Sequence, residues 1–158
     1  MRSKRSHLLF WLVTLAGLLF DQITKAIVFQ HLYPGEMREV LSGVLRLRPW
    51  TQTGMAWGLF AGYNLILTIV SAVAIITVVA IFFLYAQRLD GPTTFALALI
   101  TGGASGNLSD RLFVGQVRDF LDFYLIHWPI FNIADVLICA GAAVMIFRML
   151  RESKTGQG

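Results

Sequence analysis

Uninterrupted runs of apolar residues dominate the pattern of this chain. Residues 65–86 form a run of 22 without a charged side chain, and residues 91–109 form a second run of 19 between two aspartates. A helix needs about 20 apolar residues to cross the hydrocarbon core of a bilayer. Both runs are therefore predicted to be transmembrane helices, of which the second is richer in small residues.

Two further apolar segments carry ionisable residues near one end. Residues 8–29 contain Asp21 and Lys25, and residues 133–150 contain Asp135 close to their start. A charge at membrane depth costs about 2.5 kcal/mol or more, so such residues are candidates for a functional site. With these two segments included, the chain is predicted to be an all-α membrane protein with four transmembrane helices.

The two longer connections are expected to lie on one side of the membrane. Within residues 32–63, the stretch from Val44 to Arg48 alternates between apolar and basic side chains, which is typical of a short strand. Residues 112–132 mix aromatic and charged side chains, as segments at the headgroup layer do. We therefore expect a single integral membrane domain over residues 1–158, with a small extracytoplasmic β element at its outer end.

Composition and net charge support this interpretation. Hydrophobic residues make up 56% of the chain and charged residues only 14%, against about 25% charged residues in soluble domains. The net charge of +4 comes largely from basic residues at the ends of apolar segments. Membrane proteins carry their basic residues in this way, so we expect no nucleic-acid partner.

The distribution of charge also predicts the orientation of the chain. The side that holds both termini and the 87–91 loop carries seven basic and two acidic residues, whereas the opposite side carries six basic and seven acidic residues. Because cytoplasmic flanks of membrane helices are enriched in Lys and Arg, both termini should be cytoplasmic. The polar clusters then lie at the outer face of the membrane.

Two aspartates are candidates for a catalytic pair at that outer face. Asp119 lies among apolar residues 16 positions before Asp135, and a connection of that length can bring their carboxyl groups together. Two carboxyl groups a few ångström apart share one proton, so that one acts as a base and the other as an acid. Such a pair can activate water and protonate a peptide carbonyl without a covalent intermediate. From the residues alone, Asp122 is as good a candidate as Asp119.

Other polar residues have both a structural and a functional interpretation. Asp21 and Lys25 can form an i,i+4 ion pair worth about 0.2–0.5 kcal/mol, or they can belong to the site. Asn132 and Asp135 can cap the start of the last helix. The third apolar segment carries a polar face at its outer end, made of Asn107, Asp110 and Arg111. Three hydrogen-bonding side chains at that depth favour a function over packing.

Two other functions are compatible with these residues. A metal-dependent membrane enzyme acting on lipid phosphates could bind a divalent cation through carboxylates. The four carboxylates available for this are Asp110, Asp119, Asp122 and Asp135. The chain could also be a non-enzymatic membrane subunit, which would tolerate amides in place of the acids.

The polar motifs together resemble those of the lipoprotein signal peptidase family, also called signal peptidase II. In chain order they are Asp21-Gln22-x-x-Lys25, Gly102-Gly103-x-x-Gly106-Asn107-x-x-Asp110-Arg111, Gly115-x-Val117-x-Asp119-Phe120 and Phe131-Asn132-x-Ala134-Asp135. The resemblance covers all four apolar segments. It implies an aspartic endopeptidase of the bacterial cytoplasmic (inner) membrane, which cleaves the signal peptide from diacylglyceryl-modified prolipoproteins just before the lipidated cysteine.

The resemblance also implies roles for individual residues. Asp119 and Asp135 match the catalytic aspartates of the family. Six residues match polar positions that surround this pair and orient the substrate, namely Asp21, Lys25, Asn107, Asp110, Arg111 and Asn132. We expect a monomer that needs no metal or organic cofactor, with the prolipoprotein and membrane lipids as its partners.

The first outer segment departs from the family pattern. Where the family usually has Asn-x-Gly-x-Ala-Phe, this chain has Gln52-Thr53-Gly54-Met55-Ala56-Trp57. Glutamine keeps the amide group but places it about 1.5 Å farther from the backbone. Gln52 and Gly54 are candidate substrate-binding residues, and we expect glutamine in place of asparagine at position 52 to affect how the substrate is positioned.

Overall fold

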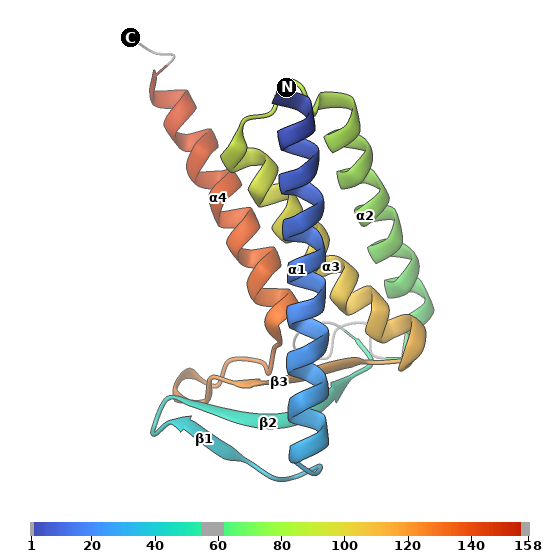
Figure 1. Ribbon diagram of the computed structural model, residues 1–158. Helices are drawn as coiled ribbons and strands as arrows, with labels where there is room; N and C mark the ends of the chain where they lie inside the picture. Colours follow the sequence, from blue (N-terminus) through green and yellow to red (C-terminus); the bar gives the residue numbers. More distant parts are fainter. Residues whose placement is uncertain (1, 55–61, 156–158) are drawn as a thin grey trace.

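Four long helices stand over a small β-sheet in the computed structural model, which describes residues 2–54 and 62–155 (Figure 1). The helices are α1 (Arg2–His31), α2 (Asn64–Tyr85), α3 (Gly91–Phe113) and α4 (Ile133–Thr155). The strands are β1 (Arg38–Leu41), β2 (Leu45–Gln52) and β3 (Val117–Asp122), and a short 3-10 helix, η2, covers Tyr124–Ile126. The expected helical membrane fold with a small β element is confirmed.

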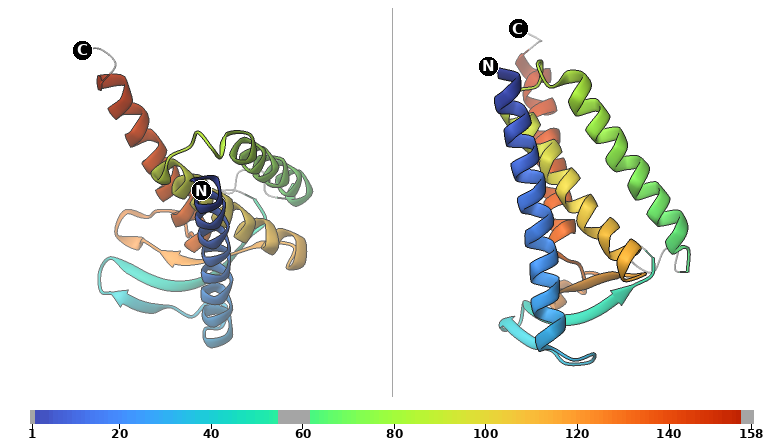
Figure 2. Two further views of the ribbon diagram at one scale, coloured as in Figure 1. Left: turned by 45° about the horizontal axis from the view of Figure 1, so that its top comes forward. Right: turned by 45° about the vertical axis from the view of Figure 1, so that its right-hand side comes forward.

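Helix α3 lies at the centre of the bundle, where it packs against α1, α2 and α4 (Figure 2). In the described part of the chain, α1, α2 and α4 are long and apolar enough to cross a membrane, and α3 is not one of these helices. Its buried side chains include Thr94, Thr101 and Asn107. A helix surrounded by other helices meets little lipid, so it can carry polar residues that a lipid-facing helix cannot.

Helix α3 also extends beyond the predicted span of 91–109 and ends at Phe113. The prediction stopped at the first charged residue, whereas the helical hydrogen bonds continue for one more turn. Asp110 and Arg111 therefore lie on the helix itself, and the Asp110 side chain is fully buried.

Glycines allow the backbones of α3 and its neighbours to approach closely. A Cβ atom on Gly103 would lie 2.4 Å from the carbonyl oxygen of Ala134 on α4, and one on Gly102 would lie 2.8 Å from that of Thr14 on α1. Real Cβ atoms do not approach a backbone atom so closely, so a side chain at either position would push the helices apart. Small residues serve this purpose at helix contacts in membranes.

We predict that Gly103→Ala destabilises the bundle by about 1–3 kcal/mol, because the added methyl group overpacks the contact between α3 and α4. The measurement is thermal unfolding of the purified protein in detergent micelles. Gly91→Ala is the matched control, since nothing lies within 4 Å of a Cβ at Gly91. An unfolding temperature equal to that of the control would contradict this account of the contact.

The sheet lies at the end of the bundle opposite to the chain termini (Figure 1). Its strands are antiparallel and follow the order β1-β2-β3. The pairing of β2 with β3 is irregular between Leu47 and Trp50, and Pro49 lies in this irregularity, where it does not have to donate a ladder hydrogen bond. Phe131 forms a bridge to Leu121 on β3. This bridge ties the segment before α4 to the sheet.

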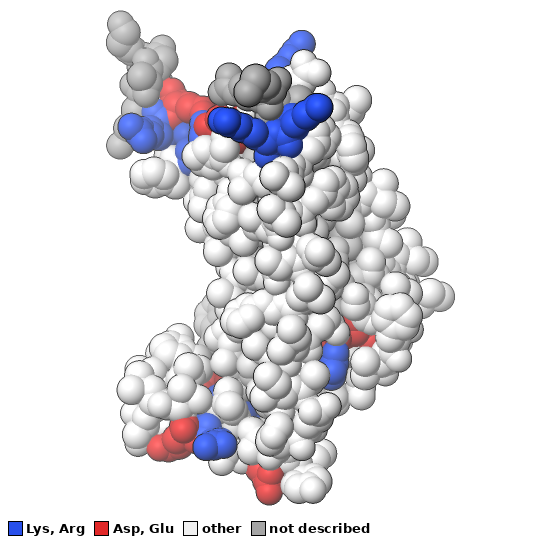
Figure 3. Space-filling view, in the orientation of Figure 1, with Lys and Arg blue, Asp and Glu red and all other residues white. Residues whose placement is uncertain are grey.

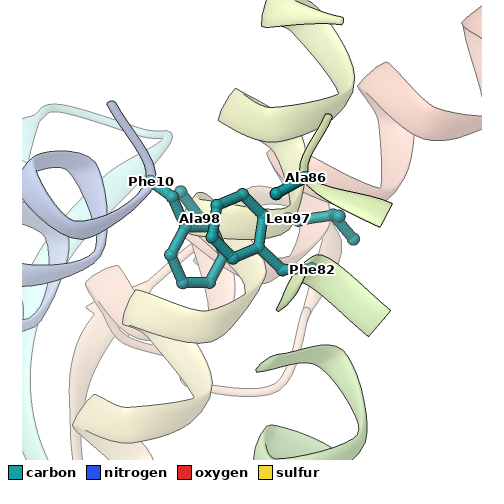
Figure 4. Packing of buried hydrophobic residues seen from close by; sticks show 5 residues of the cluster. All are labelled: Phe10, Phe82, Ala86, Leu97 and Ala98. Carbon is teal, nitrogen blue, oxygen red and sulfur yellow. The ribbon is translucent and has the colours of Figure 1, made fainter. Parts of the chain in front are cut away.

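The other end of the bundle is held by an apolar cluster. The rings of Phe10 and Phe82 stack with centroids 3.9 Å apart and planes 7° apart, next to Ala86, Leu97 and Ala98 (Figure 4). Lys and Arg side chains gather at this end, near the termini, and a broad band without charge separates them from the charges at the sheet (Figure 3). Such a band between two charged ends is the surface expected of a membrane-spanning bundle.

Candidate active site

Asp119 lies on β3 with its side chain buried under the helical bundle, 5% exposed. Its Oδ1 accepts a hydrogen bond of 2.6 Å from Nδ2 of Asn132. Burial, followed by the negative charge of Asp135, raises the pKa of Asp119 to about 7. A carboxyl group in this environment keeps its proton close to neutral pH.

Asp135 lies in the first turn of α4, where it forms a reciprocal cap with Asn132. The backbone N–H of Asn132 donates to Asp135 Oδ2 at 3.2 Å, and the backbone N–H of Asp135 donates to Asn132 Oδ1 at 3.0 Å. The other carboxylate oxygen of Asp135 accepts a hydrogen bond of 2.8 Å from Nδ2 of Asn107. Two hydrogen-bond donors, the Asn132 backbone N–H and the Asn107 amide, thus hold this carboxylate at the positive end of α4.

Asp119 and Asp135 line one cavity of about 260 Å³. Four other candidate residues line it with them, namely Gln52, Gly54, Asn107 and Arg111. The segment from Trp128 to Phe131 forms another wall. Strand β3 and the first turn of α4 therefore bring the two aspartates to the same space, as the sequence predicted.

Lys25 on α1 is the centre of a fully buried polar cluster behind this cavity. Its Nζ lies 2.8 Å from Asp21 Oδ2 and 3.2 Å from Asp110 Oδ2. It also donates to Asn107 Oδ1 at 3.2 Å. The i,i+4 pair of Asp21 and Lys25 thus exists, but Lys25 also joins α1 to α3 through Asp110 and through Asn107, which lines the cavity.

Lys25 fixes the orientation of the Asn107 amide, and the backbone N–H of Asp135 fixes that of the Asn132 amide. An ammonium group can only donate hydrogen bonds, so the Asn107 amide must present its oxygen to Lys25 and its nitrogen to Asp135. The same oxygen of Asn107 accepts a hydrogen bond of 3.0 Å from Asn132 Nδ2. The same nitrogen of Asn132 also donates to Asp119. Each aspartate of the cavity therefore receives a hydrogen bond from an amide whose orientation is set by a group that can only donate.

Asp21 also caps the start of α4. Its Oδ1 accepts a hydrogen bond of 2.9 Å from the backbone N–H of Ala134. This is one of the first N–H groups of α4, which have no partner within the helix. The closeness of this contact depends on Gly106, since a Cβ there would lie 2.4 Å from Asp21 Oδ2. A residue of α1 thus holds the first turn of α4 in place, and with it the position of Asp135.

Asp110 and Arg111 have separate roles, although they are neighbours on α3. Asp110 accepts a hydrogen bond of 2.7 Å from Nη2 of Arg118 and one of 2.8 Å from the backbone N–H of Arg118. Arg111 lines the cavity, where Nη1 lies 3.5 Å from Ser71 Oγ on α2. Among the described residues, no hydrogen-bond partner satisfies the buried Nε of Arg111.

Two residues of this network, Gln22 and Arg118, were not among the predicted site residues. Arg118 Nη2 donates to Gln22 Oε1 at 2.9 Å, and Gln22 Nε2 donates to Asp110 Oδ1 at 3.2 Å. Both residues lie next to predicted ones, in the Asp21 and Asp119 motifs. Arg118 could have been found as the cation needed to balance Asp110, because Lys25 already faces Asp21.

The structure separates the carboxylates that a metal site would need. Asp122 is paired with Arg46 at 2.7 Å on the sheet, and Asp110 is bound by Lys25 and Arg118. Within residues 2–54 and 62–155, no group of three or more His, Cys, Asp or Glu side chains is placed to hold a metal ion. The structure therefore does not support the alternative in which Asp110, Asp119, Asp122 and Asp135 share one cation. Of the first outer segment, Gln52 to Gly54 are described, and Met55 to Trp57 lie outside the described residues.

The chain is similar to known proteins over most of its length. The lipoprotein signal peptidase of Halalkalibacterium halodurans is 35% identical over 149 residues, covering 93% of this chain and 95% of the relative. The one of Gloeobacter violaceus is 37% identical over 147 residues, covering 92% and 84%. A solved bacterial membrane enzyme, determined by the in meso method, superposes with a TM-score of 0.84 at 28% identity, covering 92% of this chain and 90% of that one. A family model for signal peptidase (SPase) II matches residues 13–151, and the chain therefore belongs to the signal peptidase II family.

Proposed function

We propose that this protein is an aspartic endopeptidase that removes the signal peptide from diacylglyceryl-modified prolipoproteins, cutting just before the lipidated cysteine. Asp119 and Asp135 are the catalytic pair. The observation that carries this proposal is that both carboxyl groups line one cavity and that one residue, Asn132, bonds to both of them. Membership of the signal peptidase II family supports the same reaction.

The charge balance of the site supports a shared proton. The acidic groups are Asp21, Asp110, Asp119 and Asp135, and the cations are Lys25, Arg111 and Arg118. Four carboxylates against three cations leave one negative charge in a poorly solvated place, which is costly. One proton held between Asp119 and Asp135 removes this charge.

In this mechanism Asp119 is the acid and Asp135 is the base. Since Asp119 Oδ1 accepts from Asn132, the proton belongs on Oδ2, from which it passes to the carbonyl oxygen of the scissile peptide. Asp135 removes a proton from the attacking water, whose oxygen bonds to the carbonyl carbon. When the C–N bond breaks, Asp135 returns its proton to the leaving cysteine nitrogen and the carbonyl-derived hydroxyl returns the other to Asp119.

The location follows from the distribution of charge and the place of the cavity. We place the protein in the bacterial cytoplasmic membrane with both termini in the cytoplasm, because basic residues gather at that end. The cavity lies next to the sheet, at the outer face, where a lipid-anchored cysteine also resides. The diacylglyceryl chains then remain among the membrane lipids beside the helices, and the protein acts as a monomer.

The test uses purified protein in micelles and a synthetic diacylated prolipoprotein, with the products identified by mass spectrometry. We expect one cut, before the lipidated cysteine, at a rate that a chelator does not change. Loss of cleavage with EDTA and recovery with a divalent cation would instead favour the metal-dependent alternative. A protein that cleaves neither this substrate nor its unlipidated form would overturn the proposal.

The pKa of Asp119 predicts the pH dependence. The protonated acid is required, and the pKa of about 7 means that it is present below neutral pH and lost above it. We expect kcat/KM to fall about tenfold per pH unit at alkaline pH, with the bend near 7. A profile that rises through pH 7 to 9 would contradict the assignment of Asp119 as the acid.

A further inference from the structure

A second cavity, of about 440 Å³, adjoins the catalytic cavity along β2. It is lined by Arg46, Arg48, Trp50, Asp122, Tyr124 and His127, together with residues of the first cavity. The residues that line both cavities are Gln52, Trp128, Pro129 and Ile130. A chain bound across the catalytic pair can therefore continue into this second space, which we name the arginine cavity.

Two guanidinium groups face a single carboxylate in the arginine cavity. Arg46 Nε lies 2.7 Å from Asp122 Oδ2, and Arg48 Nη1 lies 3.9 Å from the same oxygen. The ring of Tyr124 lies 4.6 Å from the Arg46 guanidinium, so Arg46 is held on two sides. Glu39 lies outside the cavity, where it accepts 2.9 Å from the Tyr124 hydroxyl.

Arg48 forms a weaker ion pair with Asp122 than Arg46 does. Its distance of 3.9 Å from Asp122 is the limit of an ion pair, and the carboxylate is already bound at 2.7 Å by Arg46. The Arg48 guanidinium lies over the Trp50 ring, 5.4 Å from its centroid, and the side chain is 33% exposed. A guanidinium held on an aromatic face, with donors unused by a strong pair, is suited to binding a second carboxylate.

The proposed function says which part of the substrate reaches this cavity. The signal peptide is the apolar, membrane-embedded side of the scissile bond, and the mature segment is the side that leaves the membrane. The sheet lies at the end of the bundle opposite to the chain termini (Figure 1), and the proposed orientation places that end outside the cell. The segment that passes over β2 is then the mature one.

We propose that the arginine cavity binds an acidic side chain in the mature segment of the prolipoprotein, with Arg48 as the main contact. This inference rests on the proposed function and adds a determinant of substrate preference. A strand rises about 3.3 Å per residue, so Arg48 and Arg46 lie roughly 13 and 20 Å along β2 from Gln52. An extended substrate has the same rise, which places the preferred acid about four to six residues after the cysteine.

The experiment compares diacylated prolipoproteins that carry one aspartate or one asparagine at each position from two to nine after the cysteine. We expect kcat/KM to be about fivefold higher for aspartate at positions four to six, through a lower KM, and this preference to weaken in high salt. A flat profile along these positions would overturn the inference while leaving the proposed function intact. Failure to cleave any of these substrates would instead count against the proposed function.

Variants of the enzyme identify the contact. We expect Arg48→Gln to reduce the ratio of kcat/KM for aspartate to kcat/KM for asparagine to about one. Arg48→Glu should replace this preference with a preference for lysine at the same positions. Arg38→Gln is the matched control, because Arg38 is an exposed cation of the same sheet that does not line the cavity. If the preference persists in Arg48→Gln, the inference is wrong.

A phospholipid headgroup carries a negative charge too, and vesicles distinguish it from the substrate. Wild type and Arg48→Gln are compared in phosphatidylcholine vesicles with and without phosphatidylglycerol. We expect the preference for aspartate in both kinds of vesicle. If Arg48→Gln changes cleavage only where phosphatidylglycerol is present, and equally for aspartate and asparagine substrates, the cavity binds the lipid and the inference is overturned.

Discussion

Asp119→Asn and Asp135→Asn should each reduce kcat for prolipoprotein cleavage by about 10⁴-fold. An amide cannot exchange the proton that the pair needs, yet it has nearly the same shape as the acid. Asn132 can still donate to an amide oxygen at position 119, and the cap of α4 can still form with an amide at position 135. The loss should therefore appear in kcat, with little change in unfolding temperature.

Asp122→Asn is the matched comparison, since Asp122 lies three residues along the same strand. This variant loses the ion pair with Arg46, so we expect an effect of less than tenfold, and on KM. Single-turnover cleavage followed by mass spectrometry measures all three variants. Substantial turnover by either Asp119→Asn or Asp135→Asn would reject the catalytic pair.

Lys25→Met should destabilise the protein by about 3–5 kcal/mol, because it leaves buried carboxylates without their cation. Lys25 has no exposed surface and lies within 3.2 Å of both Asp21 and Asp110, whereas methionine fills much of the same volume. Thermal or denaturant unfolding in micelles measures the change. A loss of less than about 1 kcal/mol would mean that the cluster tolerates its charges without Lys25.

The double variant Lys25→Met/Asp21→Asn separates stability from catalysis. Removing one carboxylate together with the cation should recover a large part of the lost stability, while Asp110 keeps Arg118. We expect kcat to stay about 10–100-fold below wild type, because the Asn107 oxygen then loses its hydrogen bond from Lys25 and the Asn107 amide is held less firmly toward Asp135. Wild-type kcat in the double variant would show that Lys25 serves folding alone.

Apolarity predicted the helices well and the sheet poorly. The run at 65–86 coincides closely with α2, which is Asn64–Tyr85, because lipid-facing helices need an unbroken apolar surface. The alternation around Val44 to Arg48 indicated a strand, and β2 is there. Its irregular pairing between Leu47 and Trp50 depends on which strand lies beside it, and a single strand does not contain that information.

The candidate site, like the fold, was predicted only in part from the sequence. Loop length and depth indicated that Asp135 meets an acid of the outer segment, but the residues alone did not distinguish Asp119 from Asp122. In the fold, the two differ because Arg46 binds Asp122 and Asn132 binds Asp119. Asp110 and Arg111 were expected on one face with Asn107, yet successive residues point about 100° apart on a helix. Asp110 therefore faces Lys25, and Arg111 faces the cavity.

The enclosed position of α3 bears on how the nascent chain enters the membrane. A segment with so many glycine, serine and threonine residues partitions weakly into lipid by itself. The strongly apolar α2 precedes it after a short turn, so the two can be released from the translocon together as a hairpin. Full burial of α3 must then wait for α4, which is synthesised after it, and truncation before α4 should leave α3 exposed to quality-control proteases.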